Sequence, residues 1–215
     1  MTQAKFRLVF FDVDSTLAAI EGIDELAGGD PEIARLTAAA MDGEIPLDQV
    51  YGKRLEIIRP TESQVERLAE RYRRSLVPGA EETVRALGAA GASVHLVTAG
   101  IEQAVVPLAL HLGIEERRVH AVRLQFTPAG EYSGFDRRSP LAAAGGKELV
   151  VRDVRARSKG RAAFVGDGVS DLEAKPAVDL FIGYGGVQVR PRVRDNADVF
   201  IEDRDIRAVL RHLIG

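Results

Sequence analysis

Residues 7–16 read RLVFFDVDST, and this stretch decides the fold. Its apolar part, Leu8 to Phe11, is short and ends abruptly in polar residues, which predicts a strand buried on both faces, as in a parallel sheet. Asp12 and Asp14 would point to opposite faces of a strand, but beyond its end they can converge on one small volume. Buried carboxylates are costly unless paired or metal-bound, so the pair predicts chemistry in which one attacks and the other transfers protons.

Three further apolar runs end in glycines or in residues suited to chemistry. The runs, each with the residues that follow it, are Val94-His95-Leu96-Val97 before Thr98-Ala99-Gly100, Ala162-Ala163-Phe164-Val165 before Gly166-Asp167-Gly168, and Asp179-Leu180-Phe181-Ile182 before Gly183. Helical patterns lie between them, for example over residues 81–90 and 101–112. This alternation predicts an α/β fold with a doubly wound, mostly parallel, Rossmann-like sheet that binds ligands at the carboxyl ends of its strands.

The segment from residue 18 to 74 breaks the alternation, because its patterns are helical throughout and it has no strand candidate. Asp30-Pro31 predicts a helix start, with an N-cap aspartate and a proline at the first helical position. Thr61 and Gln64 fit a capping box that opens another helix. We therefore expect a helical cap at 18–74, inserted into an α/β core made of residues 1–17 and 75–215.

One further segment of the core predicts an antiparallel pair. Val122, Leu124 and Phe126 alternate with polar residues, and Pro128-Ala129-Gly130 provides a turn before Tyr132. We expect a β-hairpin or an extended edge pair here.

The composition excludes several classes of function. The 215 residues are 46% hydrophobic and 28% charged, with a formal net charge of −3, which is typical of a soluble globular protein. Basic residues form no long tract, and the Arg-rich residues 71–74 fit a solvated helix face, so nucleic acid is not an expected partner. The absence of cysteine excludes disulfides, a thiol nucleophile and a zinc–thiolate site. The first apolar run is too short for a signal peptide or a membrane span, so we expect a cytoplasmic protein without membrane contact.

Asp167 and Asp171 add two carboxylates at the end of another predicted strand. Gly166 and Gly168 allow the backbone to turn tightly there. Mg²⁺ takes oxygen ligands, commonly one or two carboxylates with substrate phosphate and water. Asp12 and Asp167 on neighbouring strands would meet that demand, whereas a Gly-Asp turn without metal is the plainer alternative.

A phosphate cradle is predicted after the second strand. Thr98 would end that strand and offer a hydroxyl, while Ala99 and Gly100 would offer N–H groups at the start of the next helix. Lys147 follows two glycines and could bring a positive charge to the phosphate. Taken alone, these residues would be a strand-to-helix turn and an exposed lysine at a helix start.

Together, these four elements resemble the haloacid dehalogenase (HAD) superfamily of phosphohydrolases. The pattern of that superfamily is Asp-x-Asp-x-Thr, then a Ser or Thr, then a Lys, then Gly-Asp-x-x-x-Asp. The sequence has all four in this order, and they begin at Asp12, Thr98, Lys147 and Gly166. Since they span nearly the whole chain, the resemblance implies a HAD core with the helical cap and with Mg²⁺ as cofactor.

Within that superfamily the chain looks like the phosphoserine phosphatases. The matching segments are Phe11-Asp12-Val13-Asp14-Ser15-Thr16, Glu21-Gly22-Ile23-Asp24-Glu25-Leu26, Ala40-Met41, Arg54-Leu55, Gly145-Gly146-Lys147, Gly166-Asp167-Gly168 and Gly183-Tyr184-Gly185-Gly186 with Arg190. They lie in both cap and core. The resemblance implies hydrolysis of O-phospho-L-serine to L-serine and phosphate through an aspartyl phosphate, the last step of serine biosynthesis.

The resemblance also implies a role for each matching residue. Asp12 would attack phosphorus, and Asp14 would protonate the serine oxygen and then activate water. The implied catalytic residues are Asp12, Asp14, Thr98 and Lys147, and the implied metal residues are Asp12, Asp14 (through its backbone carbonyl), Asp167 and Asp171 (through water). The implied substrate-binding residues are Glu21, Met41, Arg54, Thr98, Ala99, Gly100, Lys147, Ser170 and Arg190. Glu21 would face the substrate ammonium and Arg54 its carboxylate, which suits both charges.

Several of these residues have plainer readings. Glu21 and Arg54 could be surface charges of the cap, and Met41 could be a core residue. Arg190 could simply form an ion pair with an acidic neighbour, without a role in substrate binding. The chain also departs from the family. It has Thr98-Ala99-Gly100 where Ser-Gly-Gly is usual, Ser170 where Asn or Thr is more frequent, and Asp42 at a position that is often glycine.

These departures put the identity of the substrate in question, and two alternative functions remain open. One is hydrolysis of, or phosphotransfer from, another small phosphomonoester. The other is a phospho-accepting receiver protein, which would lack both the helical insertion and the Gly-Asp-Gly turn with its second aspartate. We expect a small-molecule substrate, and a monomer or a homodimer.

Overall fold

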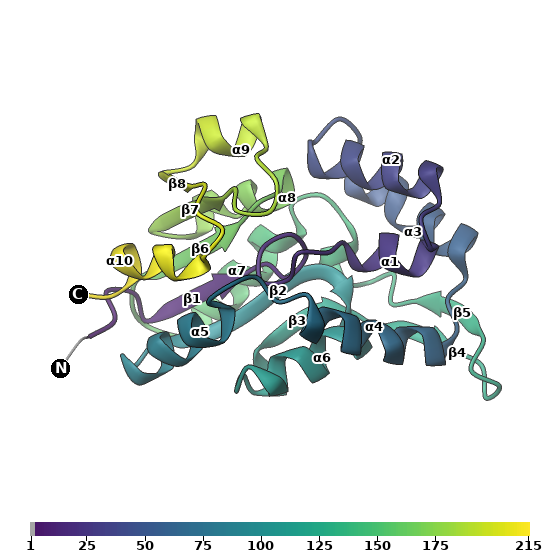
Figure 1. Ribbon diagram of the computed structural model, residues 1–215, viewed down its shortest axis with the longest axis horizontal. Helices are drawn as coiled ribbons and strands as arrows, with labels where there is room; N and C mark the ends of the chain where they lie inside the picture. The colour runs from purple at the N-terminus through teal and green to yellow at the C-terminus, as the bar shows by residue number, and fades with distance from the viewer. Residues whose placement is uncertain (1–2) are drawn as a thin grey trace.

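A six-stranded parallel sheet lies at the centre of the computed structural model, which describes residues 3–215 (Figure 1). Its strand order is β3-β2-β1-β6-β7-β8, so the chain winds outward in both directions from β1, as a doubly wound sheet requires. The strands are β1 (Leu8–Phe11), β2 (Ser93–Ile101), β3 (Val119–Val122), β6 (Ala162–Gly166), β7 (Leu180–Tyr184) and β8 (Val199–Ile201). The predicted α/β class and the mostly parallel sheet are confirmed.

The register of the central strands brings the predicted chemistry to one edge of the sheet. Phe10, Phe164 and Phe181 are paired across β1, β6 and β7, and their rings stack at centroid distances of 6.3 and 6.0 Å. Phe11, the last residue of β1, pairs with Val165, and β6 continues by one residue to Gly166. Asp12 and Asp167, the residues that follow them, therefore meet at the carboxyl edge.

Helices lie around the central sheet (Figure 1). Those of the core are α5 (Ala80–Ala89), α6 (Glu102–His111), α7 (Gly146–Arg157), α8 (Val169–Leu172), α9 (Pro191–Asn196) and α10 (Leu210–Leu213), with 3₁₀ turns at Glu116–Arg118, Pro140–Ala142, Lys175–Ala177 and Ile206–Val209.

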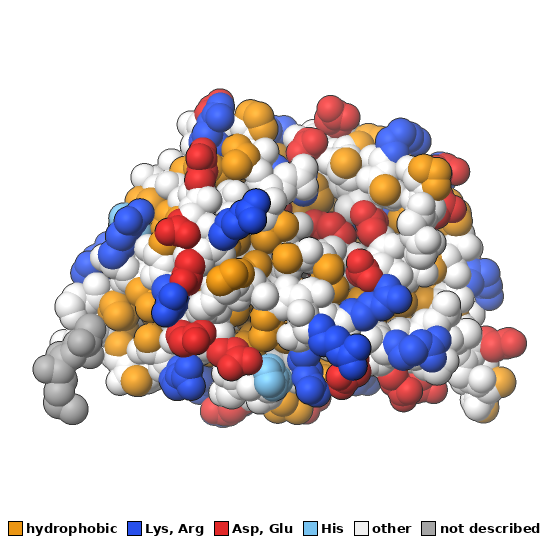
Figure 2. All heavy atoms as spheres, viewed as in Figure 1, with side chains coloured by type: hydrophobic (Ala, Val, Ile, Leu, Met, Phe, Trp, Pro, Cys, Tyr) orange, Lys and Arg blue, Asp and Glu red, His pale blue; other side chains and the backbone are white. Residues whose placement is uncertain are grey.

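Across residues 3–215, none of the helices is long and apolar enough to span a membrane. Acidic and basic side chains are interleaved on the face shown in Figure 2.

The segment 18–74 folds into four helices, and none of its residues, all of which are described, belongs to a strand. They are α1 (Gly22–Ala27), α2 (Pro31–Met41), α3 (Leu47–Ile58) and α4 (Glu62–Arg74). The Asp30 side chain caps α2, and Thr61 with Gln64 forms the capping box of α4, as predicted. Figure 1 shows α1, α2 and α3 gathered beside the sheet, whereas α4 packs along α6.

The predicted hairpin is present, but its first strand is shorter than the alternation indicated. The strands β4 (Leu124–Phe126) and β5 (Tyr132–Phe135) form a separate antiparallel sheet. Val122 instead belongs to β3, where it pairs with Ile101 of the main sheet. The chain changes sheets at Arg123, and an alternating pattern cannot reveal such a change because both strands continue it.

Candidate active site

Three buried aspartates form a cluster of oxygen donors at the carboxyl ends of β1 and β6. Asp12, Asp167 and Asp171 each present a carboxylate oxygen, and these oxygens lie within 4.8 Å of one another. Each of the three residues is at most 2% exposed. Glycine is required beside them, because a Cβ at Gly166 would lie 2.3 Å from Asp171 Cγ. The cluster suits a hard metal ion, since all of its donors are oxygens.

Two cations partly balance this negative charge. Lys147 Nζ lies 2.9 Å from Asp12 Oδ2 and 2.6 Å from Asp171 Oδ1. Burial opposes the charge of Lys147, but the two carboxylates prevail and raise its pKa. Gly146 allows α7 to begin here, since a Cβ on it would lie 1.8 Å from the Pro140 carbonyl oxygen. Lys147 is thus a buried site residue, not the exposed helix-start lysine that its local sequence alone would indicate.

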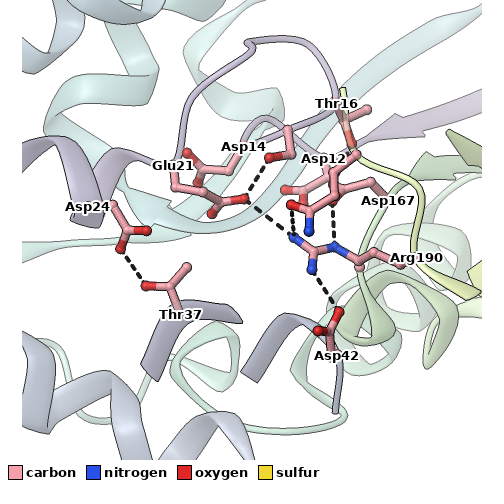
Figure 3. A network of polar contacts seen from close by, with 12 residues as sticks. Asp12, Asp14, Thr16, Glu21, Asp24, Thr37, Asp42, Asp167 and Arg190 are labelled. Atoms are coloured by element: carbon pink, nitrogen blue, oxygen red, sulfur yellow. Dashed lines mark hydrogen bonds and ion pairs between the residues drawn. The ribbon is translucent and has the colours of Figure 1, made fainter. Parts of the chain in front are cut away.

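Arg190 is the second cation and connects three acidic groups (Figure 3). Its Nε donates to Asp167 Oδ2 at 3.1 Å and its Nη1 donates to Asp42 Oδ1 at 2.8 Å. Its Nη2 lies 4.0 Å from Glu21 Oε1. Arg190 thus forms ion pairs with acidic neighbours, which is the simpler of the two roles considered for it. It does not line the pocket described below.

Asp14 lies beside Asp12 and is held at one oxygen. Its Oδ1 accepts hydrogen bonds from the Tyr72 hydroxyl at 2.7 Å and from the Gly22 N–H at 2.8 Å. Burial and the charge of Asp12 raise its pKa to about 7, against the opposite effect of these hydrogen bonds and of Lys147. A carboxyl group with a pKa near neutrality can both donate and accept a proton in one reaction cycle.

The other carboxyl groups of the cluster are also harder to ionise than usual. Burial, followed by the charge of Asp12, raises the pKa of Asp167 to about 6. The same two causes raise the pKa of Asp171. Counting Glu21 and Asp14, five buried or half-buried carboxyl groups lie near three buried cations, Lys147, Arg190 and Arg54. The excess of acidic groups favours a divalent cation at the cluster.

One pocket collects most of the predicted residues. It is lined by Asp12, Asp14, Glu21, Met41, Arg54, Thr98, Ala99, Gly100, Lys147 and Ser170, together with Ile23, Ala40 and Leu47, for which no site role was predicted. Asp167, Asp171 and Arg190 lie outside this lining. The sheet and α7 supply one wall of the pocket, and α1, α2 and α3 supply the other.

Glu21, which is half-buried, and Arg54, which is buried, are opposite charges of this lining rather than surface charges. Glu21 Oε1 accepts a hydrogen bond from Ser15 Oγ at 2.7 Å, and burial and the charges of Asp14 and Asp167 raise the Glu21 pKa. Arg54 is 5% exposed, and its Nη1 donates to Thr37 Oγ1 at 2.8 Å. Within residues 3–215, the buried Nε of Arg54 has no hydrogen-bond partner.

The predicted end of the second strand at Thr98, with a helix starting directly after it, is wrong. Strand β2 continues to Ile101 and α6 begins only at Glu102, because β3 still pairs with β2 at Ile101 after a register shift. Ala99 and Gly100 are therefore strand residues, not the first amides of a helix. The Gly100 N–H donates to Thr98 Oγ1 at 3.0 Å.

The sequence patterns did not identify two further residues, Tyr72 and Thr37, whose hydroxyl groups contact residues of the site. Tyr72 lies in the Arg-rich segment 71–74, which fits a solvated face, yet it continues the inward stripe of Val65 and Leu68 on α4. That helical spacing was the available signal. The Thr37 hydroxyl donates a hydrogen bond to Asp24 (Figure 3) and accepts one from Arg54 Nη1. No spacing rule links these three residues.

Comparisons with known proteins agree with this geometry. A family model described as haloacid dehalogenase-like hydrolase matches residues 6–179. The chloroplastic phosphoserine phosphatase of Arabidopsis thaliana is 43% identical over 202 residues, which cover 90% of this chain and 68% of the relative.

Two solved structures of phosphoserine phosphatase, each 28% identical to this chain, have the same architecture. The substrate-bound complex aligns with a TM-score of 0.85 over 96% of this chain and 98% of the other. The phospho-aspartyl intermediate analogue aligns with a TM-score of 0.84 over 97% and 99%. The likeness therefore includes both the sheet and the helices of segment 18–74.

Proposed function

This chain belongs to the haloacid dehalogenase-like hydrolase family, and we propose that it hydrolyses O-phospho-L-serine to L-serine and inorganic phosphate. The observation that carries the proposal is a pair of opposite charges, the half-buried Glu21 and the buried Arg54, in the pocket that also holds Asp12 and Asp14. Phosphoserine has an ammonium for Glu21, a carboxylate for Arg54 and a phosphate for the aspartate end. Phosphoserine phosphatases at 43% and 28% identity support the same substrate.

The proposed reaction has two displacements at phosphorus. A carboxylate oxygen of Asp12 attacks phosphorus, and the bond between phosphorus and the serine oxygen breaks. The serine oxygen keeps the electron pair of that bond and accepts a proton from Asp14. Water then attacks the aspartyl phosphate and gives a proton to Asp14, while the bond between phosphorus and Asp12 breaks and phosphate is released. Lys147 and the Thr98 hydroxyl would stabilise the phosphoryl oxygens during both steps.

We propose Mg²⁺ as the metal of the aspartate cluster. Asp12 and Asp167 would hold it directly, with the backbone carbonyl of Asp14, and Asp171 would support it through water. The all-oxygen donor set and the excess of buried acidic groups fit this ion. When bound, Mg²⁺ supplies positive charge to the phosphoryl oxygens and lowers the pKa values of the clustered carboxyl groups.

The remaining predicted residues would shape the pocket around serine. Met41 is proposed as an apolar wall, and Ser170, Ala99 and Gly100 as contacts of the substrate and its phosphate. Arg190, held by Asp42 and Asp167, would approach the phosphate from outside the lining. The extra methyl groups of Thr98 and Ala99 would make this pocket tighter than one lined by Ser-Gly-Gly.

We further propose that residues 18–74 act as a cap over a core of residues 1–17 and 75–215. Glu21, Met41 and Arg54 all come from this segment, so its position decides whether the substrate site is complete. A monomer or homodimer in the cytoplasm is also our proposal, which light scattering and cell fractionation test.

Phosphate release from a panel of esters tests the proposed function. With Mg²⁺, phosphoserine should give a much larger kcat/KM than phosphoethanolamine, which lacks the carboxylate, or p-nitrophenyl phosphate. A chelator should abolish release from all three, and added Mg²⁺ should restore it. Equal turnover of phosphoethanolamine and phosphoserine would refute the substrate, and release that survives the chelator would refute the metal.

A further inference from the structure

Tyr72 brings a buried hydroxyl to the proposed proton donor. The residue lies near the end of α4, is 0% exposed, and donates its hydroxyl proton to Asp14 Oδ1 at 2.7 Å. The Gly22 N–H donates to the same oxygen at 2.8 Å. Within residues 3–215 no donor reaches the other oxygen, Oδ2. The two oxygens of Asp14 are therefore not equivalent.

The packing around the Tyr72 hydroxyl fixes its position. A Cβ at Gly22 would lie 2.0 Å from this hydroxyl oxygen, so α1 can approach it only through a glycine. A Cβ at Gly100 would lie 3.4 Å from the same oxygen and 3.1 Å from Asp14 Oδ2. The ring of Tyr72 is held by the inward face of α4, which packs on α6. The hydroxyl is thus built into the site from outside the predicted motifs.

The free oxygen of Asp14 lies on the pocket side. A Cβ at Gly100 would be 3.1 Å from Asp14 Oδ2 and 3.2 Å from Thr98 Oγ1, and all three residues line the pocket. Since Oδ1 already accepts two hydrogen bonds, a proton on Asp14 resides on Oδ2.

We propose that Tyr72 is a positioning residue that holds Asp14 by Oδ1, so that Oδ2 carries the proton for the reaction. The inference rests on the proposed phosphatase activity and adds a residue to it. In the first step the Oδ2–H bond breaks and the proton passes to the ester oxygen, which leaves phosphorus with the electron pair of the broken bond. In the second step a proton from the attacking water returns to Oδ2. Tyr72 keeps its own proton throughout.

The dependence of rate on the leaving group separates this role from a merely structural one. Esters with basic leaving groups need the proton from Asp14, whereas esters such as p-nitrophenyl phosphate, with weakly basic ones, need it little. In Tyr72→Phe, kcat/KM for phosphoserine should fall by about tenfold or more, while kcat/KM for p-nitrophenyl phosphate should change by less than about threefold. Across a series of substituted phenyl phosphates, the plot of log kcat/KM against leaving-group pKa should become steeper.

A second variant and a matched control complete the test. Gly22→Ala should displace the Tyr72 hydroxyl and steepen the same plot, which keeps the test available if Tyr72→Phe folds poorly. Tyr132→Phe removes another buried hydroxyl, one without a hydrogen-bond partner in the described chain, and should leave the slope unchanged. An equal loss for all esters, or no loss, in Tyr72→Phe would overturn the inference. A wild-type protein that hydrolyses none of the esters would instead refute the proposed function.

Discussion

Arg54 has a guanidinium group that is buried without a full set of partners. Thr37 Oγ1 accepts a hydrogen bond from Nη1, whereas Nε has no partner among residues 3–215. Burial lowers the pKa of Arg54, although the neighbouring Tyr51 and Asp24 oppose this. An unpaired buried donor destabilises the free protein, and a ligand carboxylate would satisfy it.

Arg54→Ala should therefore lower kcat/KM selectively. Hydrogen bonds to charged groups contribute about 1.5–3 kcal/mol, which corresponds to a loss of about 10- to 100-fold for phosphoserine. Phosphoethanolamine, which has no carboxylate, should lose less than about threefold by the same assay. Lys53→Ala, which removes a cation exposed on the same helix, is the control and should leave both substrates unaffected. Equal losses for the two esters would remove Arg54 from carboxylate recognition.

The site could be predicted residue by residue only where polar residues interrupt an apolar pattern. Asp12 and Asp167 end buried strands, and the register of β1 and β6 brings them together as expected. Tyr72 and Thr37 could not be located in this way. Their contacts depend on how α4 and α2 pack against the core and against α3, and local sequence does not encode that packing.

At the scale of elements, two histidines couple strands β2 and β3. His95 and His120 stack with centroids 5.6 Å apart, and His95 Nδ1 lies 3.4 Å from His120 Nε2. Burial, followed by the charges of His120 and Arg118, lowers the pKa of His95 to about 4. His95 is therefore neutral in the folded protein at pH values where it is protonated in the unfolded chain.

This difference predicts a loss of stability in acid. The His95 contribution is complete above the unfolded pKa of about 6.5 and is lost as the pH falls from there toward 4, because only the unfolded state binds the proton in that range. The free energy of unfolding, measured by urea titration, should fall more steeply between pH 7 and pH 4.5 in the wild type than in His95→Gln. Parallel pH profiles would show that the histidine pair does not have this effect.

The elements themselves were predicted where their patterns are long or fully apolar. The central strands and the caps of α2 and α4 follow from local sequence. The edge strands β3 and β8 were not predicted, because they are short and only partly buried, and parallel pairing with a neighbour decides their existence. The extension of β2 to Ile101 depends on the same long-range pairing.

At the scale of the whole molecule, segment 18–74 and the core meet around the pocket. Asp42, at the end of α2, pairs with Arg190 of the core. Gly43 lies close to the start of α8, since a Cβ on Gly43 would be 3.3 Å from the Cβ of Val169. Substrate enters and product leaves through this boundary if the cap opens in each cycle.

A crosslink across the boundary tests this motion. The chain has no cysteine, and the distance between positions 43 and 169 is close to that of a disulfide, so the pair Gly43→Cys and Val169→Cys can be oxidised selectively. We expect the oxidised double variant to turn over at least about tenfold more slowly than the reduced one, since lid opening often limits turnover. Gly43→Cys alone controls for the strain of a side chain at φ +72° and should be insensitive to oxidation. Equal rates in the oxidised and reduced double variant would exclude cap opening.

The central claim is that Asp12 becomes phosphorylated in each cycle, and chemical trapping measures this directly. Turnover of phosphoserine is stopped with acid, the acyl phosphate is reduced with borohydride, and the digested protein is examined by mass spectrometry. We predict that Asp12 is converted to homoserine, and that this conversion requires substrate. In Asp12→Asn, both the homoserine product and phosphate release should be absent. Reduction at Asp14 or elsewhere, or phosphate release from Asp12→Asn at the wild-type rate, would contradict the claim.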